Sequence, residues 1–251
     1  MNVARRISVI QDMLLYTSIK KWLRFLSDFK QFKKLSTRGH QRFHLLWKDI
    51  YPCLVDRTKQ TNFDRHYVYH LGWAARIIAR TNPDFHVDIS SSLFFSSMIS
   101  AFIPVQFYDY RPADLQFTQL SSEYADLLSL PFGNEHIHSL SCMHAVEHVG
   151  LGRYGDSLDP DGDLKAFREL QRILAGGGSL LLVVPVGQPR IMFNAHRIYA
   201  YRQILSYFNE LELKEFALVP DEPEEGGIIH NAVEALADAQ QYGCGCFWFS
   251  K

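Results

Sequence analysis

At 251 residues, with 47% hydrophobic and 14% aromatic content, the chain can bury one large core but cannot hold a second catalytic domain. Its longest apolar runs, such as Leu180 to Val184, fall far short of the ~20 residues that a membrane span needs, and no secretion signal is recognisable. The net charge is −1, and no basic groove interleaved with aromatic residues indicates nucleic acid as a partner. We therefore expect a cytoplasmic protein with one large core that does not bind nucleic acid.

The first 64 residues are predicted to form a basic helical extension. Up to His40, basic residues far outnumber the acids Asp12 and Asp28. Apolar residues recur there at helical spacing and are flanked by lysines; they are Ile19, Trp22, Leu23, Leu26 and Phe29. Such a helix can lie on an anionic membrane surface, bind an acidic partner, or pack on its own domain. Peripheral membrane contact is therefore one expectation among three.

Residues 65–251 are predicted to form an α/β domain. A helix from about Arg65 to Thr81 ends at Asn82-Pro83 and leads into a strand at 85–89. A helix at 93–101 and a strand at 103–108 follow. Farther on, 200–208 reads as a helix, and 211–219 and 242–249 read as strands.

The stretch from Ser139 to Val186 reads as one strand, helix, strand unit. In its helix Leu164, Phe167, Leu170 and Leu174 share one face, and the glycines at 176–178 are predicted to end the helix. Strands and helices that alternate at this spacing favour a parallel sheet with right-handed crossovers. Ligands of such sheets bind beyond the carboxyl ends of the strands, so the site is expected just after residue 143.

This order of elements, with the stretch Asp126-Leu-Leu-Ser-Leu-Pro131-Phe132, resembles class I S-adenosylmethionine-dependent methyltransferases. Three further segments, at 150–162, 193–197 and 242–246, are similar to an uncharacterised methyltransferase-like domain of unknown function. The resemblance covers about residues 67–249. It implies a Rossmann-like fold with a mostly parallel seven-stranded sheet, helices on both faces, and a last antiparallel strand inserted beside the sixth.

The resemblance also implies that S-adenosylmethionine is the cofactor. The family's glycine-rich first loop, D-x-G-x-G-x-G, corresponds here to Asp88, Ser90, Ser92 and Phe94, so all three glycines are absent. Small serines still let backbone amides approach a ligand, and their hydroxyls offer hydrogen bonds. Phe94 either belongs to the core or occupies part of the methionine pocket, and in the second case the domain would be catalytically silent.

The family's other cofactor contacts have counterparts in this sequence. Asp109 stands where an acid takes the two ribose hydroxyls, although a strand-end aspartate can also simply cap the next turn. Tyr110 is expected beside the base or ribose, and Asp126 with Leu127 beside the adenine edge. The complete set expected to bind the cofactor is Asp88, Ser90, Ser91, Ser92, Asp109, Tyr110, Asp126, Leu127 and His144.

Methyl transfer needs alignment of the acceptor and, for a hydroxyl acceptor, a base. His148 is the preferred base, with Glu147 and His196 as further catalytic candidates; each histidine can instead be structural. We predict no metal site, because His144 and His148 give only an i, i+4 pair without a third ligand. Cys244 and Cys246 face the same side of a strand and are read as structural thiols.

Several polar residues are candidates for binding the acceptor, which is expected to be a small molecule or a saccharide. They are Arg153, Tyr154, Arg190, Asn194 and Arg197. The sequence thus predicts an S-adenosylmethionine-dependent methyltransferase acting on an unidentified acceptor. The alternative is a catalytically silent domain of the same fold that binds a partner, a ligand or a membrane surface.

Overall fold

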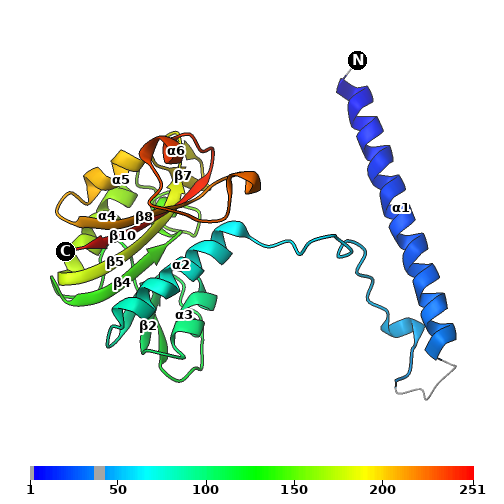
Figure 1. The fold of residues 1–251 in the computed structure, drawn as a ribbon, viewed down its shortest axis with the longest axis horizontal. Coiled ribbons are helices and arrows are strands. Elements are labelled where there is room, and N and C mark those ends of the chain that lie inside the picture. The colour runs from blue at the N-terminus through cyan, green and yellow to red at the C-terminus, as the bar shows by residue number, and fades with distance from the viewer. Residues whose placement is uncertain (1–2, 37–42) are drawn as a thin grey trace. The chain divides into compact units, whose positions relative to one another are not determined.

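A computed structural model describes residues 3–36 and 43–251, with side chains from Thr17 onward. The chain divides into two compact units, Met1–Asn62 and Phe63–Lys251. Figure 1 shows both units, and each is described here by itself.

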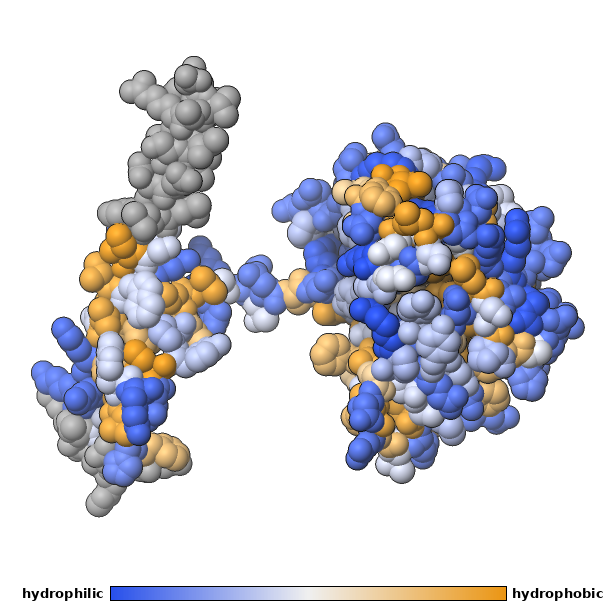
Figure 2. All heavy atoms as spheres, turned by 180° about the vertical axis from the view of Figure 1, so that it is seen from behind, coloured by the Kyte–Doolittle hydropathy of each residue, from blue (hydrophilic) through white to orange (hydrophobic). Residues whose placement is uncertain are grey.

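The first unit contains a long helix, α1 (Val3–Ser36), and a short 3-10 helix, η1 (Trp47–Asp49). The ring of Phe29 meets that of Trp47 edge to face with centroids 5.4 Å apart, so η1 packs on α1. Leu23 is 61% exposed, and Trp22 is exposed as well. Figure 2 shows apolar side chains gathered on this unit among hydrophilic ones. In the described residues, no helix has a stretch long and apolar enough to cross a membrane.

The second unit is built on one large sheet with the strand order β3-β2-β1-β4-β5-β10-β8-β9. The parallel strands are β1 (His86–Ile89), β2 (Val105–Asp109), β3 (Leu120–Tyr124), β4 (Ile137–Met143) and β5 (Leu174–Val186). The antiparallel strands are β8 (Glu212–Val219), β9 (Ile229–His230) and β10 (Gly243–Ser250). The α/β fold predicted from the sequence is confirmed, with β10 inserted between β5 and β8. The sheet has eight strands where seven were expected, because the two-residue strand β9 extends one edge.

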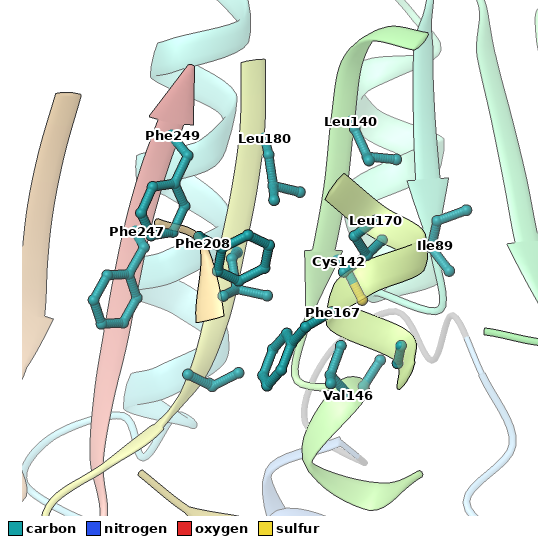
Figure 3. Close-up of a cluster of buried hydrophobic side chains, with 14 of the residues drawn as sticks. Ile89, Leu140, Cys142, Val146, Phe167, Leu170, Leu180, Phe208, Phe247 and Phe249 are labelled. Carbon is teal, nitrogen blue, oxygen red and sulfur yellow. The ribbon is translucent and has the colours of Figure 1, made fainter. Parts of the chain in front are cut away.

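Helices cover both faces of this sheet (Figure 1). The helices α2 (Arg65–Thr81) and α3 (Leu93–Ile99) bury Trp73, Ile77 and Phe95 on one face. On the other face, α4 (Gly162–Ile173) and α5 (Tyr201–Tyr207) lie over a core that includes Phe167 and Leu170. Figure 3 shows that second core between the strands and α4.

The helix α2 begins and ends where its sequence provides caps. Asp64 precedes it, and the Asp64 carboxylate accepts the backbone N–H of Tyr67 at 3.1 Å. Asn82 ends it in the left-handed conformation, with φ 44°, just before Pro83. The N-terminal turn of α2 is thereby fixed, and it carries His66 and Tyr67.

The sequence analysis gave no bounds for the third strand, and its end for the helix before the triple glycine was wrong. The third strand is Leu120–Tyr124, and the segment 126–132 forms the loop after it. The helix before the triple glycine ends already at Ile173, and Leu174 pairs with Ile137 as the first residue of β5. The glycines therefore lie inside the long strand β5, where the N–H of Gly177 donates to the carbonyl of Lys251 at 2.8 Å.

The remaining elements are short. A hairpin of β6 (Arg190–Met192) and β7 (His196–Ile198) follows β5. The 3-10 helix η2 (Val146–His148) follows β4 directly. The elements η3 (Pro223–Glu225) and α6 (Glu234–Asp238) lie between β8 and β10.

Candidate functional site

Two cavities open at the carboxyl ends of the parallel strands. The first cavity, of about 210 Å³, has walls from β2, the loop after β3 and the loop after η2. The second cavity, of about 640 Å³, has walls from the start of α2, the ends of β1 and β4, and the residues around Tyr242. Ser90, His144, His148 and Tyr154 line both. The two cavities therefore adjoin at the end of β4, where the sequence predicted the site.

Four of the expected cofactor residues line the first cavity without touching the second: Asp109, Tyr110, Asp126 and Leu127. Asp109 Oδ1 accepts the backbone N–H of Arg111 at 2.7 Å, so this carboxylate does cap the next turn. Asp126 Oδ1 likewise accepts the N–H of Leu128 at 2.8 Å. Each side chain is thus held in place through one oxygen, and the second oxygen of a carboxylate can accept further hydrogen bonds.

The first loop is organised differently from a simple ligand cradle. Asp88 is completely buried and accepts hydrogen bonds from the hydroxyls of Ser96 and, at 2.6 Å, Ser141. Burial raises the pKa of Asp88 to about 6, against the opposing effect of these hydroxyls. His86 extends this network of buried hydrogen bonds. Its Nε2 lies 2.9 Å from Ser141 Oγ, and its Nδ1 lies 2.8 Å from Ser139 Oγ. Burial lowers the pKa of His86 to about 3, so this ring is neutral.

The serines of the first loop have separate roles. Ser90 adopts the left-handed conformation, with φ 55°, and lines both cavities. Ser91 lines the second cavity and accepts the backbone N–H of Met143 at 3.0 Å. Ser92 and Asp88 line neither cavity. Phe94 also lines neither, and it is 78% exposed, so it does not fill a cofactor pocket.

A buried acid and two histidines follow β4. His144 Nδ1 lies 3.0 Å from Glu147 Oε1, and His148 Nε2 lies 3.8 Å from the same oxygen. His144 Nε2 and Glu147 Oε2 are buried without a hydrogen-bond partner in the part of the chain that the structure describes. Since buried polar atoms are nearly always paired, these two atoms are available to a water molecule or a ligand in the second cavity, which both residues line.

The charge state of this group follows from its surroundings. Burial lowers the pKa of His144, but interactions with Cys244 and Glu147 outweigh it and raise the pKa above its ordinary value. Burial raises the pKa of the Cys244 thiol far above its usual range, so the thiol is neutral and we assign the effect on His144 to the Glu147 carboxylate. Burial opposes ionisation of Glu147 as well, yet its hydrogen bond from His144 brings the pKa of Glu147 below its ordinary value. His144 and Glu147 therefore form a buried ion pair.

Of the other two catalytic candidates, only His148 lies at the cavities. Its Nδ1–H donates to the carbonyl of Ala195 at 2.6 Å, which leaves Nε2 as the nitrogen with a free lone pair. His196 lines neither cavity, and its ring packs against Tyr242 with centroids 4.7 Å apart. Burial lowers the pKa of His196.

The expected acceptor-binding residues separate into two groups. Arg153 and Tyr154 line the second cavity, where the guanidinium of Arg153 lies 5.0 Å from the centre of the Tyr154 ring. Arg190, Asn194 and Arg197 line neither cavity. Arg197 is buried and donates to the carbonyls of Val149, Asp159 and Pro160, and Arg190 donates to those of Gln188 and Gln241. These two arginines tie loops together.

The loop that closes the first cavity is rigidly built. Asp156 Oδ2 accepts the N–H groups of Gly150, at 2.8 Å, and Gly152, at 3.2 Å. Gly150 has a φ of 79°, and a side-chain carbon there would lie 2.1 Å from the carbonyl oxygen of Asp159. Only glycine fits at that position, so the family-like segment 150–162 shapes the cavity wall.

Among the site residues that the sequence reasoning missed are His66 and Tyr67 at the start of α2, and Tyr242 and Cys244 near the start of β10. His66 stacks on His144 with centroids 5.7 Å apart and also on Tyr242. The ligand atoms of His66, His144 and Cys244 all lie within 4.8 Å of one another. The only sequence signal was the Tyr-Gly-Cys-Gly-Cys segment, which gives no hint of His66.

Comparisons with known proteins agree with this fold. Residues 114–216 match a family described as Caenorhabditis protein of unknown function, DUF268. No curated protein matches the chain. Among solved structures, a proposed methyltransferase of Bacillus halodurans C-125 is 15% identical with a TM-score of 0.51, over 71% of this chain and 97% of the other.

Two further solved structures have the same fold. The 1,6-didemethyltoxoflavin-N1-methyltransferase of Burkholderia thailandensis, solved with S-adenosylhomocysteine, is 12% identical with a TM-score of 0.51, over 72% of this chain and 79% of the other. The [4+2]-cyclase SpnF gives the same identity and TM-score, over 72% and 81%. The second unit of this chain therefore has the class I methyltransferase-like fold. Since a cyclase shares it, the fold alone does not fix the reaction.

Proposed function

We propose that the second unit binds S-adenosylmethionine in the first cavity and transfers its methyl group to a small or saccharide-like acceptor in the second cavity. The observation that carries this proposal is that three separate segments bring Ser90, Asp109, and the pair Asp126 and Leu127 to the wall of one cavity. They belong to the nine residues that the family resemblance assigned to the cofactor, of which Tyr110 and His144 also line this cavity. The Burkholderia enzyme with bound S-adenosylhomocysteine supports the same choice of cofactor.

In this proposal Asp109 accepts hydrogen bonds from the ribose hydroxyls. Its Oδ1 is held by the N–H of Arg111, and the residue lines the first cavity, so Oδ2 is the oxygen that would accept from the ribose. A preorganised carboxylate makes charge-assisted hydrogen bonds, which are stronger than neutral ones. Asp126 presents its second oxygen in the same way to the amino group of adenine.

The absence of the family's glycines is compatible with cofactor binding. Ser90 already adopts a left-handed conformation, at a cost of roughly 1 kcal/mol. Phe94 is exposed and leaves the cavities open. These two facts favour the binding proposal over the catalytically silent alternative.

His148 is the residue that we propose as the base. Its Nδ1–H is used by the Ala195 carbonyl, so Nε2 is free to take a proton from an acceptor hydroxyl. Glu147, 3.8 Å from that nitrogen, stabilises the imidazolium that forms. Arg153 and Tyr154, beside His148 in the second cavity, offer donors to a hydroxylated acceptor.

The test is calorimetric titration of the full chain with S-adenosylhomocysteine. We expect binding in the micromolar range, and we expect Asp109→Ala to weaken it by about 1.5 to 3 kcal/mol, since hydrogen bonds to a charged group are lost. Asp84→Ala is the matched control, because Asp84 is an exposed aspartate before β1, at the other end of the sheet. Equal affinity of the two variants would remove the ribose assignment, and no binding by the unmodified chain would favour the silent alternative.

For the first unit we propose peripheral contact with an anionic membrane surface. The exposed Trp22 and Leu23 lie beside Lys20 and Lys21 on α1, and apolar side chains next to lysines suit the boundary between lipid headgroups and acyl chains.

Vesicle sedimentation tests this contact. Leu23→Glu should lower binding to phosphatidylserine vesicles by ~10-fold or more, because it removes an apolar side chain and adds a repelled charge. Val233→Glu makes the same kind of change at an exposed residue of the second unit and should leave binding unaltered. Equal sedimentation of both variants and the unmodified chain would refute the proposal.

A further inference from the structure

We propose that His66, His144 and Cys244 bind a divalent transition-metal ion of the zinc type. Their three ligand atoms lie within 4.8 Å of one another. His66 comes from the first turn of α2, His144 from the end of β4, and Cys244 from the start of β10. Three elements that are remote in sequence thus deliver two imidazoles and one thiol to one point.

The strongest support is the environment of His144. Its Nε2 is buried and makes no hydrogen bond to a nitrogen or oxygen of the described residues, and the neighbour that acts on this imidazole from within the cluster is the Cys244 thiol. The Nδ1 of His144 is 3.0 Å from Glu147 Oε1. A histidine held by a carboxylate through one nitrogen, with the other nitrogen directed at the metal, is the usual arrangement at zinc sites. Glu147 would fix the ring orientation for an ion at Nε2.

The chemistry of the donors selects the class of ion. Imidazole nitrogen and thiolate sulfur suit zinc and similar borderline-soft ions, whereas magnesium and calcium prefer oxygen ligands. On binding, the Sγ–H bond of Cys244 breaks, a metal–sulfur bond forms, and the proton leaves to solvent. The proton on Nε2 of His144 is released in the same way. Each ligand then offers one electron pair to the ion, and no redox partner is needed.

The geometry requires a small contraction. In a tetrahedral site with metal–nitrogen bonds of about 2.0 Å and a metal–sulfur bond of about 2.3 Å, neighbouring ligand atoms lie roughly 3.3 to 3.6 Å apart. The present limit of 4.8 Å means that side chains must approach by about 1 Å. His66 is only partly buried and stands in the first helical turn, so a side-chain rotation can supply this movement.

Three protein ligands leave a fourth position open. His66, His144 and Glu147 all line the second cavity, and therefore the open position faces it. Zinc sites with three protein ligands and one exchangeable position are typical of catalytic centres, while structural sites have four protein ligands. A water molecule, or an oxygen, nitrogen or sulfur atom of a small molecule in the cavity, is the expected fourth ligand.

Two neighbours allow a specific test. Cys246 places its Sγ 3.9 Å from that of Cys244, and it is also completely buried, yet it does not belong to the cluster. His196 packs on Tyr242 near the cluster and is not part of it either. Substituting these residues removes a thiol or an imidazole of the same kind without removing a proposed ligand.

The experiment uses the full chain, loaded with Zn²⁺ and freed of loose ions by gel filtration, with metal content measured by elemental analysis. About one zinc per chain is expected. His66→Ala and Cys244→Ser should each weaken zinc affinity by ~100-fold or more, and Glu147→Gln by ~10-fold, since carboxylates behind a ligand typically matter by 10- to 100-fold. Cys246→Ser and His196→Ala should keep one zinc per chain.

Cobalt gives a second readout that does not depend on activity. The Co²⁺-loaded chain should show a sulfur-to-cobalt charge-transfer band that Cys244→Ser loses and Cys246→Ser retains. If Cys244→Ser fails to fold, His66→Ala decides the question, because His66 lies at the partly exposed start of α2. Substoichiometric zinc in the unmodified chain, or zinc retained equally by His66→Ala, would overturn the proposal. Both measurements are made without S-adenosylmethionine, so they succeed or fail independently of the methyltransferase proposal.

Discussion

The carboxyl ends of β1 and β4 lie next to each other in the sheet, yet the buried polar side chains at these two ends differ in whether they have hydrogen-bond partners. At β1, the two carboxylate oxygens of Asp88 accept hydroxyl hydrogens from Ser141 and Ser96. At β4, within the described residues, His144 Nε2 and Glu147 Oε2 have no partner. A polar group that is satisfied from within is part of the scaffold, whereas an orphaned one at a cavity wall is available to a ligand.

Position at the end of a strand therefore does not by itself define a site residue. Ser90 after β1 and His144 after β4 share the same left-handed backbone, with φ 55° in both. Both also line both cavities. The two strand ends differ in where their carboxylates lie. Asp88, in β1, lines neither cavity, whereas Glu147, after β4, lines the second cavity.

Among these substitutions, Glu147→Ala should lower the free energy of unfolding most. Removing this carboxylate leaves the His144 imidazolium buried without its counter-charge, which typically costs about 3 to 5 kcal/mol of the free energy of unfolding. Urea denaturation of the metal-free chain measures it. Glu147→Gln is the matched control, because the amide keeps the volume and can still accept from His144 Nδ1–H.

The pH dependence sharpens this prediction. The pKa of Glu147 is lowered on folding, so its contribution is present above the ordinary value of 4.5 and lost as pH falls. Despite burial, the Glu147 carboxylate raises the pKa of His144 above its ordinary value of 6.5, so the contribution of His144 is complete below pH 6.5 and lost as pH rises through the raised pKa. The stability difference between the unmodified chain and Glu147→Ala should therefore be largest near pH 5 to 6.5. A difference that grows towards pH 10 would contradict the ion pair.

Asp88→Asn should change the free energy of unfolding in the opposite direction and stabilise the chain. The pKa of Asp88 rises from 3.8 to about 6 on folding, mainly through burial, so the charged form is disfavoured in the folded chain. Its contribution is complete below pH 3.8 and lost as pH rises through 6. A shift of about 2 units corresponds to about 2 to 3 kcal/mol. Asp88→Asn should thus exceed the unmodified chain in stability by up to that amount at pH 7.5, and the two should converge near pH 4.

Denaturation at both pH values checks this prediction. Asp84→Asn serves as its control, since Asp84 is exposed and should show no such convergence. A loss of stability in Asp88→Asn at pH 7.5 would mean that the serine hydroxyls need the charge, and that the two strand ends are alike.

Local patterns were enough to predict most of the fold. The three-residue spacing of Leu164, Phe167 and Leu170 indicated the buried face of α4, and Phe167 and Leu170 are fully buried. The prediction that the triple glycine ends the helix was wrong, because these glycines lie in a strand where the N–H of Gly177 donates to the carbonyl of the distant Lys251. The two-residue strand β9 is too short for any periodicity, so the sequence could not indicate an eighth strand.

The candidate site was predictable only where it follows a strand. His144, Glu147 and His148 come directly after β4, so topology places them at the cavities. His66 and Cys244 meet His144 only through tertiary folding, and no spacing rule links residues so far apart. The burial of Asp88 is likewise invisible in the sequence, because it depends on Ser141, 53 residues away.

The smallest effect should come from Ser90→Gly, and it tests whether strain is stored at the β1 end. Ser90 holds φ 55°, which costs a residue with a side chain roughly 1 to 2 kcal/mol that glycine does not incur. Glycine in turn loses about 0.5 to 1 kcal/mol more backbone entropy on folding. The Ser90 hydroxyl contributes little, because its contact with the Tyr108 carbonyl is long, at 3.4 Å, and the backbone N–H of Ser90 keeps its own bond to that carbonyl at 2.7 Å. We therefore expect Ser90→Gly to raise the free energy of unfolding by about 0.5 kcal/mol, measured by urea denaturation. Ser91→Gly loses the hydrogen bond from the Met143 N–H, so it should lower the free energy of unfolding by ~1 kcal/mol or more. Equal losses in the two variants would show that Ser90 is bonded into the scaffold as firmly as Ser91 is, and the left-handed turn would then not be a point of strain.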